Sequence, residues 1–428
     1  MEGTYWDGVE TIQRDGLKKL QLKRLNKTFE RARKSRFYRE RLPETINSLD
    51  ALKDIPFTTK SDLRSSFPNG MLSVPQEEII RLHSSSGTTG RATVIYHTRS
   101  DIDSWADLVA RSMYMTGVRK SDVFQNMMGY GLFTGGLGLH YGSERLGALT
   151  IPASSGNSIR QIRLMKEFNS TVIHITPSYA LHLYTLFQEE CIDPVSDLHL
   201  RIAFLGAEPY SEETRKRIES LYGLDAFNSY GLSEMNGPGV AFECPVKEGM
   251  HVWEDSYILE VVDPETGDLL SDGEEGEIVL TTLKREGMPV IRYRTGDIAS
   301  VFPGECPCGR THRKISRIKG RTDDMLIIKG VNLYPMQIEK ILMDIPEVGN
   351  NYLIEIEKID YLDSINIKVE VRPEIFHGDI IELENLKKRI VGDLKNEILI
   401  HPRITFVEPN SLPRSEGKAV RVVDNRSK

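Results

Sequence analysis

The run Ser84-Ser85-Ser86-Gly87-Thr88-Thr89-Gly90-Arg91 carries five hydroxyl side chains, two glycines and a terminal cation. It separates residues 79–83 from residues 92–96, two short runs that predict a pair of strands and therefore a hairpin. Glycine allows successive N–H groups to point into one concavity, and each hydroxyl adds a rotatable donor. The loop is therefore typical of a polyphosphate site, with a flexible Ser/Gly surface loop as the alternative. It is not a Walker loop, because no Gly-Lys-Ser/Thr closes it.

Beyond this hairpin, helix-like and strand-like segments alternate. Residues 101–116 have apolar side chains at helical spacing. The strand-like segments are residues 148–153, 171–176, 200–206 and 224–227, and helical segments end at Phe168 and span residues 177–190. This alternation predicts an α/β fold with a parallel sheet and flanking helices. Ligands bind such sheets beyond the carboxyl ends of the strands.

Three polar loops lie where a ligand of that sheet is expected. Gly206-Ala207-Glu208-Pro209 follows one strand, and Asn228-Ser229-Tyr230-Gly231-Leu232-Ser233-Glu234 follows the next. The second loop offers an aromatic ring for a base and a carboxylate for a divalent cation. Asp297, in Arg294-Thr295-Gly296-Asp297, could accept hydrogen bonds from a ribose diol, with a solvated turn residue as the alternative.

The pattern changes from Tyr257 onward. Short strands are separated by acidic turns at residues 263–267 and 271–276, which predicts an antiparallel subdomain. Near the end of the chain, strand-like residues 352–357 and 365–371 and helical residues 337–343 and 383–397 predict a compact α+β unit.

Composition restricts the class of function. The chain has 428 residues, of which 39% are hydrophobic and 27% charged, as in soluble proteins of two or three domains. A net charge of −7 gives no general attraction for nucleic acid or an anionic membrane. Neither a spanning apolar run nor a secretory leader is apparent, so we expect a cytoplasmic protein that binds no membrane.

The cysteines are too few for a disulfide scaffold. Cys306-Pro307-Cys308 is a tight pair of thiols, and Cys244 with His251 adds two further soft ligands. Together Cys244, His251, Cys306 and Cys308 form a Cys₃His set that suits a structural tetrahedral Zn²⁺ ion, with reduced structural cysteines as the alternative. His312 is a reserve ligand, and Cys191, in a helical stretch, is predicted to lie in the core.

The order of these loops resembles the adenylate-forming acyl-CoA ligase superfamily over nearly the whole chain. The hydroxyl-rich loop, the Tyr-Gly-Leu-Ser-Glu loop, the Arg-Thr-Gly-Asp loop, residues 320–323 and a late Gly417-Lys418 follow one another in the family's order. Within the superfamily, the run 129–136 and Asp324-Met-Leu-Ile-Ile-Lys-Gly-Val-Asn-Leu-Tyr-Pro335 look like those of the phenylacetate-CoA ligases. The resemblance implies adenylation of a carboxylic acid by ATP, followed by transfer of the acyl group to CoA with release of AMP and pyrophosphate.

The resemblance also implies a role for each matching residue. Residues 84–91 would hold the β- and γ-phosphates, with Arg91 where many relatives have lysine. Glu234 would bind Mg²⁺, Asp297 the ribose, and Arg321 the nucleotide. Tyr230, with Ser229 and Gly231 beside it, and the Gly206-Ala207-Glu208-Pro209 loop would flank the adenine. Lys418 would bridge the carboxylate and the α-phosphate during adenylation.

The two half-reactions need different groups at one site, and similar enzymes solve this by rotating a small C-terminal domain. Asp323 matches the hinge, which puts the domain boundary between residues 322 and 323. After rotation, Lys329 and Gly330 would replace Lys418 beside the CoA arm. A homodimer is one option for the assembly.

The acyl pocket is implied by segments that line it in similar enzymes. They contain Tyr130, Phe133, Thr134, Gly135, Ile175, Pro177 and Ala207. The glycine density of residues 129–138 indicates either closely packed backbones or room for a flat ring, so phenylacetate or another aryl acid is the expected substrate. Two other functions fit the same motifs: an adenylating enzyme that loads a carrier-protein thiol, and a non-catalytic nucleotide-binding homologue.

Overall fold

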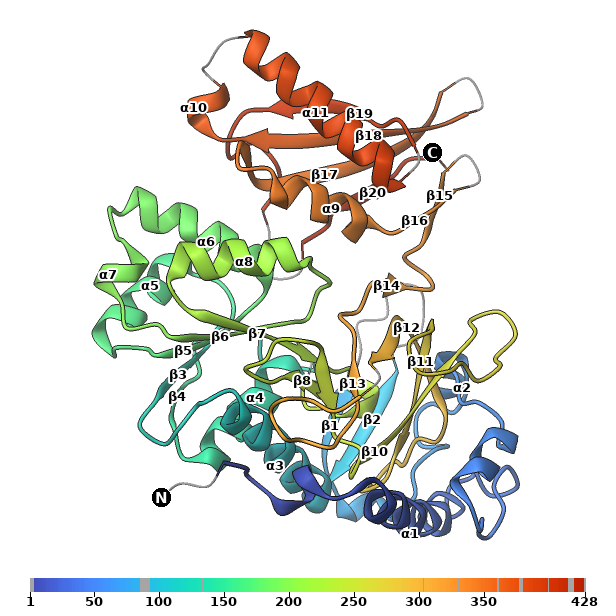
Figure 1. Ribbon diagram of the computed structural model, residues 1–428. Helices are drawn as coiled ribbons and strands as arrows, with labels where there is room; N and C mark the ends of the chain where they lie inside the picture. The colour runs from blue at the N-terminus through green and yellow to red at the C-terminus, as the bar shows by residue number, and fades with distance from the viewer. Residues whose placement is uncertain are drawn as a thin grey trace.

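The computed structural model describes residues 4–84, 93–132, 134–302, 304–328, 331–359, 362–376, 380–398, 400–414 and 419–426. Figure 1 shows a large domain, drawn in blue to yellow, and a small domain, drawn in orange and red above α6 and α8. This α/β arrangement confirms the predicted fold class. Nowhere in the described ranges is a helix both long enough and apolar enough to cross a membrane.

One mixed sheet organises the large domain. Its strand order is β10-β11-β12-β13-β9-β8-β7-β6-β5-β3-β4, with β14 paired to β12. The parallel strands are β3 (Val123–Asn126), β4 (Leu149–Ile151), β5 (Val172–Ile175), β6 (Ile202–Leu205) and β7 (Asp225–Tyr230). The antiparallel ones are β8 (Ala241–Glu243), β9 (Met250–Val252), β10 (Tyr257–Val262), β11 (Glu275–Thr282), β12 (Tyr293–Phe302), β13 (Lys314–Ile315) and β14 (Gly320–Arg321). The predicted antiparallel subdomain is therefore continuous with the parallel sheet.

Helices cover both faces of the parallel strands, because alternate strand residues point to opposite sides. Ile173, Ala203 and Leu205 pack on the side of α5 (Ser158–Glu167), α6 (Pro177–Glu189) and α8 (Glu212–Tyr222). Ile202 and Phe204 pack on the side of α3 (Arg99–Met115) and α4 (Gly135–Leu146). The short helix α7 (Pro194–Asp197) precedes β6.

The N-terminal segment wraps the antiparallel half. Its elements are η1 (Gly8–Thr11), α1 (Arg14–Ala32), η2 (Leu49–Asp54), α2 (Lys60–Ser65) and η3 (Gln76–Glu78). Thr59 caps α2 through a capping box with Asp62. The hairpin is also confirmed: β1 (Ile79–Ser84) and β2 (Val94–Thr98) pair antiparallel, with Ser84 opposite Val94.

Close helix packing accounts for part of the glycine-dense segment. A Cβ atom at Gly138 would lie 2.7 Å from Trp105 of α3, and one at Gly142 would lie 2.4 Å from Val109. Helices α3 and α4 can therefore approach only because these positions lack side chains. The sequence left two interpretations of the glycines in residues 129–138, closely packed backbones or room for a flat ring. Close packing explains Gly138.

One prediction about the core is wrong. Cys191 is exposed and has a φ of 52°, because α6 ends at Glu189 and the chain turns there. A helical pattern in the sequence does not define the residue at which the helix ends.

The small domain has its own core. A four-stranded sheet in the order β19-β18-β17-β20 packs against α9 and α11. Its elements are the hairpin β15 (Leu326–Ile328) and β16 (Val331–Leu333), then α9 (Pro335–Asp344), β17 (Val348–Ile359), β18 (Leu362–Val371), α10 (Pro373–Phe376), α11 (Ile380–Ile398), β19 (Arg403–Val407) and β20 (Val422–Asp424). Residues 322–325 connect β14 of the large sheet to β15 of this domain.

Candidate active site and candidate metal centre

Strands β7, β12 and β14 bring Tyr230, Asp297 and Arg321 together. Tyr230 ends β7, and its hydroxyl donates to Asp297 Oδ2 over 2.6 Å. Arg321 lies opposite Asp297 in the β12–β14 pairing and donates to Asp297 Oδ1 over 2.8 Å. Burial raises the pKa of Asp297, and Arg321 and Tyr230 oppose that rise. Each carboxylate oxygen keeps a second lone pair, so the group can still accept from a ribose hydroxyl.

Glu234 lies in η4 (Ser233–Met235), and only 6% of it is exposed. Its Oε1 atom accepts a hydrogen bond from Thr93 Oγ1, 3.4 Å away at the start of β2. Burial and Glu234 together raise the pKa of the Tyr293 hydroxyl above its usual range. A guanidinium nitrogen of the buried Arg285 donates to the Glu234 carbonyl oxygen and fixes this turn. A carboxylate held this way beside the hairpin suits a cation bound to phosphates.

The hairpin meets the predicted acyl-pocket segment. The Ser84 N–H donates to the Leu132 carbonyl oxygen over 3.0 Å. Thr134 is buried next to α4, and its hydroxyl lies 3.3 Å from Ser233 Oγ. Gly135 is the first residue of α4 and is buried. The described ends of the hairpin, Ser84 and Thr93, therefore lie next to the predicted acyl-pocket segment and the Glu234 turn.

Tyr130 contributes a fixed hydroxyl to that region. Asn126 Nδ2 donates to it over 2.9 Å, and His140 Nδ1 lies 3.2 Å away. Burial raises the pKa of Tyr130 to about 12, so the hydroxyl keeps its proton at neutral pH. The Tyr130 hydroxyl is therefore a neutral polar group within the predicted acyl-pocket segment.

The segments around the ends of β6 and β7 are closely packed. A Cβ atom at Gly206 would lie 2.7 Å from Ser229 Oγ on β7, and one at Gly231 would lie 2.6 Å from the Gly237 backbone. Ala207 has a left-handed φ of 70°. Gly231 is therefore required by backbone proximity.

Glu208 has partners in both domains. Its Oε1 accepts from the Ser178 N–H over 2.7 Å, and its Oε2 accepts from the Ala419 N–H over 2.9 Å. Burial raises its pKa, and these hydrogen bonds oppose that rise. Pro209 lies beside Glu208 in the wall of a cavity of about 350 Å³ between the domains, which Pro177, Leu181, Asp323, Met336 and Ala419 also line.

Several predicted site residues lie outside the described residues. They are Ser85, Ser86, Gly87, Thr88, Thr89, Gly90, Arg91, Phe133, Lys329, Gly330 and Lys418. Their roles stay predictions. The residues that sequence reasoning missed are Thr93, Tyr293 and Arg285 around Glu234, and nothing in their local pattern marks them.

Four soft ligands meet at one point, as the sequence predicts. Cys244 follows β8, His251 lies on β9, and Cys306 and Cys308 lie in the connection between β12 and β13. Their candidate ligand atoms all lie within 4.8 Å of one another. The Sγ atoms of Cys244 and Cys306 are 3.7 Å apart, and Cys308 Sγ lies 3.3 Å from His251 Nε2. A zinc tetrahedron with Zn–S bonds of about 2.3 Å has S···S edges of about 3.8 Å.

A backbone carbonyl orients the histidine of this set. His251 Nδ1 lies 2.8 Å from the carbonyl oxygen of His312, which can only accept. Nδ1 therefore carries the proton and Nε2 faces the thiols, an arrangement common in zinc sites. The His312 side chain points elsewhere, toward the Glu254 N–H and the Val9 carbonyl oxygen, so the prediction of His312 as a reserve ligand is wrong.

Comparison with known proteins finds close relatives over the whole chain. The model of the AMP-binding enzyme family matches residues 21–283, and that of the AMP-binding enzyme C-terminal domain matches residues 330–426. A phenylacetate-coenzyme A ligase of Pseudomonas putida is 44% identical over 98% of this chain and 97% of its own length.

Solved structures of one ligase distinguish two domain arrangements. The 2-hydroxyisobutyryl-CoA ligase in its postadenylation state has a TM-score of 0.94 at 29% identity, covering 99% of this chain and 93% of that one. The same ligase in its thioesterification state, with the same coverage and 30% identity, has a TM-score of only 0.73. The two domains of this protein are therefore arranged as in the postadenylation state.

Proposed function

Because this chain belongs to the phenylacetate-coenzyme A ligase family of AMP-binding enzymes, and is an AMP-forming acid–CoA ligase, we propose that its acid is phenylacetate or a close aryl relative. The observation that carries the proposal is the likeness to phenylacetate-coenzyme A ligases along 98% of the chain. The 3.3 Å contact between Thr134 Oγ1 and Ser233 Oγ supports it, because the acid has to lie next to the nucleotide site.

An acid panel tests this choice. With ATP, Mg²⁺ and CoA, we expect kcat/KM for AMP release to be highest with phenylacetate. A buried ring should favour it over short-chain acids by about 10–100-fold in kcat/KM. Benzoate serves as the matched control for the missing methylene. A preference for a short-chain acid would contradict the proposal.

The same reactions separate CoA from a carrier protein as the acceptor. We expect chromatography to detect an acyl-CoA thioester in step with AMP. AMP release without thioester in the presence of free CoA would favour the carrier-loading alternative.

We propose the following roles at the nucleotide site. Residues 84–91 bind the β- and γ-phosphates and Asp297 the ribose, while Tyr230 with the 206–209 loop flanks the adenine. Arg321 contacts the nucleotide from the linker, and its hydrogen bond to Asp297 over 2.8 Å supports a joint role. Glu234 is the proposed Mg²⁺ ligand, supported by its burial next to the start of β2.

We also propose that residues 1–322 and 323–428 are two domains that move about Asp323. Asp323 accepts a hydrogen bond from Arg321 Nε over 2.8 Å between the last strand of the large sheet and the first of the small domain. Lys329 and Gly330 would then face CoA in the second orientation. A cytoplasmic location and a homodimer stay predictions.

The Cys₃His set is proposed as a structural zinc site. The donor types, the 3.7 Å sulfur separation and the orientation of His251 support Zn²⁺. The N-terminal segment packs on the same connection, where the Tyr5 hydroxyl donates to the Cys308 carbonyl oxygen over 3.2 Å. A metal here would hold that connection against β8 and β9, away from the reacting atoms.

Metal analysis of protein purified without added zinc should find about one equivalent of Zn²⁺. Cys306→Ser should lose it, because three ligands hold a structural ion weakly. Cys191→Ser is the matched control and should keep the metal, since Cys191 is exposed and remote from the set. Less than half an equivalent in the wild type, or no loss in Cys306→Ser, would contradict the site.

A further inference from the structure

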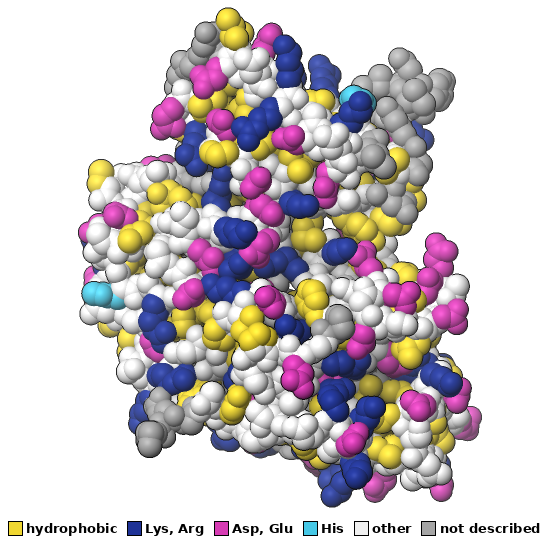
Figure 2. Space-filling view, viewed as in Figure 1, with side chains coloured by type: hydrophobic (Ala, Val, Ile, Leu, Met, Phe, Trp, Pro, Cys, Tyr) yellow, Lys and Arg dark blue, Asp and Glu magenta, His cyan; other side chains and the backbone are white. Residues whose placement is uncertain are grey.

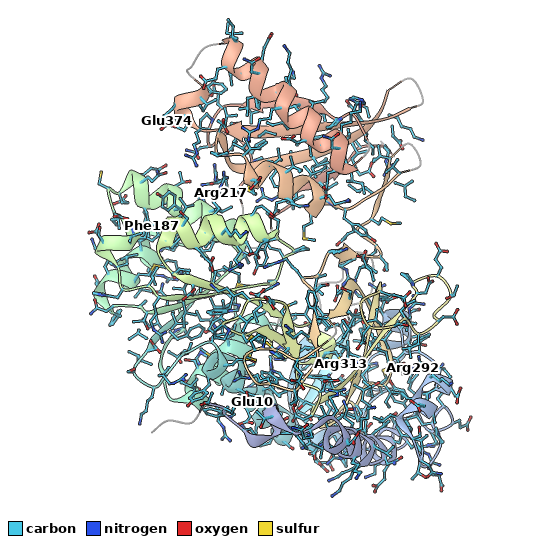
Figure 3. The ribbon with its side chains drawn as sticks, in the orientation of Figure 1. Glu10, Phe187, Arg217, Arg292, Arg313 and Glu374 are labelled. Carbon is cyan, nitrogen blue, oxygen red and sulfur yellow. The ribbon has the colours of Figure 1, made fainter. Side chains whose placement is uncertain are left out.

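Helix α8 of the large domain and helix α9 of the small domain each carry a charged side chain that contacts one end of the other helix. Figure 3 shows Arg217 on α8, pointing toward the small domain. In Figure 2, basic and acidic side chains adjoin one another across the middle of this face. A helix N-terminus favours an anion and a helix C-terminus favours a cation. Helix α9 supplies an anion to the N-terminus of α8, and α8 supplies a cation to the C-terminus of α9.

Glu339 brings a carboxylate from α9 to the first turn of α8. Its Oε1 atom accepts from the Ser211 N–H over 3.0 Å and from Thr214 Oγ1 over 2.7 Å. Ser211 is the N-cap residue of α8. Oε2 accepts from the Tyr352 hydroxyl over 2.8 Å within the small domain. Only 6% of Glu339 is exposed, so these hydrogen bonds replace those to water.

Arg217 makes the reciprocal contact from α8 to the end of α9. Its terminal nitrogens donate to the carbonyl oxygens of Ile345 and Val348, each over 3.2 Å, and of Gly349 over 2.9 Å. Ile345 is the C-cap residue of α9. Burial, with Arg372 nearby, lowers the pKa of Arg217 to about 10, which still leaves the group charged at neutral pH.

Apart from the hydrogen bond from Tyr352, these contacts cross between the domains in the arrangement that resembles the postadenylation state. Residue 419, next to the predicted catalytic lysine, docks on Glu208 in the same arrangement. If the α8–α9 contacts break while the domains stay together, the buried charges of Glu339 and Arg217 lose their partners without gaining water. These charges reach water only if the domains separate. The contacts can therefore bias the equilibrium between domain orientations.

We propose that Glu339 and Arg217 form a clasp that holds the small domain in the adenylation orientation, and so are positioning residues that set the balance between the two half-reactions. Neither side chain needs to touch substrate. Weakening the clasp should slow the half-reaction that requires the docked domain and spare the one that requires its departure.

The half-reactions can be measured separately for Glu339→Gln and Arg217→Met. We expect phenylacetate-dependent pyrophosphate exchange to fall about tenfold, since each variant removes charge-assisted hydrogen bonds. Formation of thioester from supplied phenylacetyl-adenylate and CoA should stay within about twofold of the wild type or rise. Glu397→Gln is the matched control, because Glu397 pairs with Lys340 of α9 over 3.4 Å inside the small domain. It should change neither rate.

A distance measurement tests the clasp without any substrate. Spin labels on the exposed Cys191 of the large domain and on Glu374→Cys of α10 report the separation of the domains. The wild-type background should give one dominant distance, and Glu339→Gln should add a second population. Coincident distance distributions, or equal changes in both half-reactions, would overturn the proposal. Because this readout needs no turnover, it stays informative if phenylacetate is not the acid.

Discussion

Lys418→Ala should lower phenylacetate-dependent pyrophosphate release by about 10²–10³-fold, because it removes the cation proposed to bridge the carboxylate and the α-phosphate. The adjacent backbone supports this position. The Ala419 N–H donates to Glu208 Oε2 over 2.9 Å, which ties residue 419 to the 206–209 loop proposed to flank the adenine. The effect should be confined to adenylation, since the proposed rotation of the small domain would remove this lysine from the site during transfer to CoA.

Three measurements make this prediction specific. Calorimetric titration should find ATP binding retained, and thioester formation from supplied acyl-adenylate should persist. Lys387→Ala, an exposed lysine of α11, should behave as the wild type. Unchanged pyrophosphate release in Lys418→Ala would refute the assignment. A wild type that binds ATP but activates no acid would favour the non-catalytic alternative.

Asp255→Asn should destabilise the large domain by about 3–5 kcal/mol, because it removes one partner of a buried charge cluster. Asp255 Oδ1 accepts from the fully buried Arg111 over 2.8 Å, and Lys284 Nζ lies 2.8 Å from Oδ2. Burial opposes ionisation of Asp255, but Arg111 and Lys284 outweigh it, so its pKa lies well below its usual range. The neutral amide would leave the buried Arg111 with Asp7, 3.7 Å away, as its nearest remaining ion-pair partner.

Urea denaturation as a function of pH checks this effect. A depressed carboxylate pKa stabilises the fold above the unfolded value of about 4, and that contribution is lost as the pH falls below it. The variant should therefore show a weaker fall in unfolding free energy between about pH 5 and pH 2. The control Asp272→Asn breaks an exposed 3.5 Å pair with Arg313 and should change stability by less than about 1 kcal/mol. Equal destabilisation by both variants would contradict the buried-cluster explanation.

Local patterns in the sequence predicted most of the elements and the loops of the site. Strands β1 and β2 pair on either side of the hydroxyl-rich run as expected, and the Tyr-Gly-Leu-Ser-Glu segment begins at the end of β7. These features depend on periodicity and turn chemistry, which short windows of sequence encode. The Cys₃His set was also recognisable, because ligand chemistry limits the residue types.

Contacts between distant segments needed the tertiary structure. Nothing local marks Glu339 as an anion for α8, Glu208 as the partner of Ala419, or Arg285 as the support of the Glu234 turn. The exposed Cys191 and the buried His312, whose ring nitrogens contact Glu254 and Val9 in place of the metal site, were mispredicted for the same reason. The sequence alone was enough to predict the fold class, the family motifs and the order of the two half-reactions, adenylation followed by transfer to CoA. Only the tertiary structure decided which buried charges meet, because burial and pairing depend on segments hundreds of residues apart.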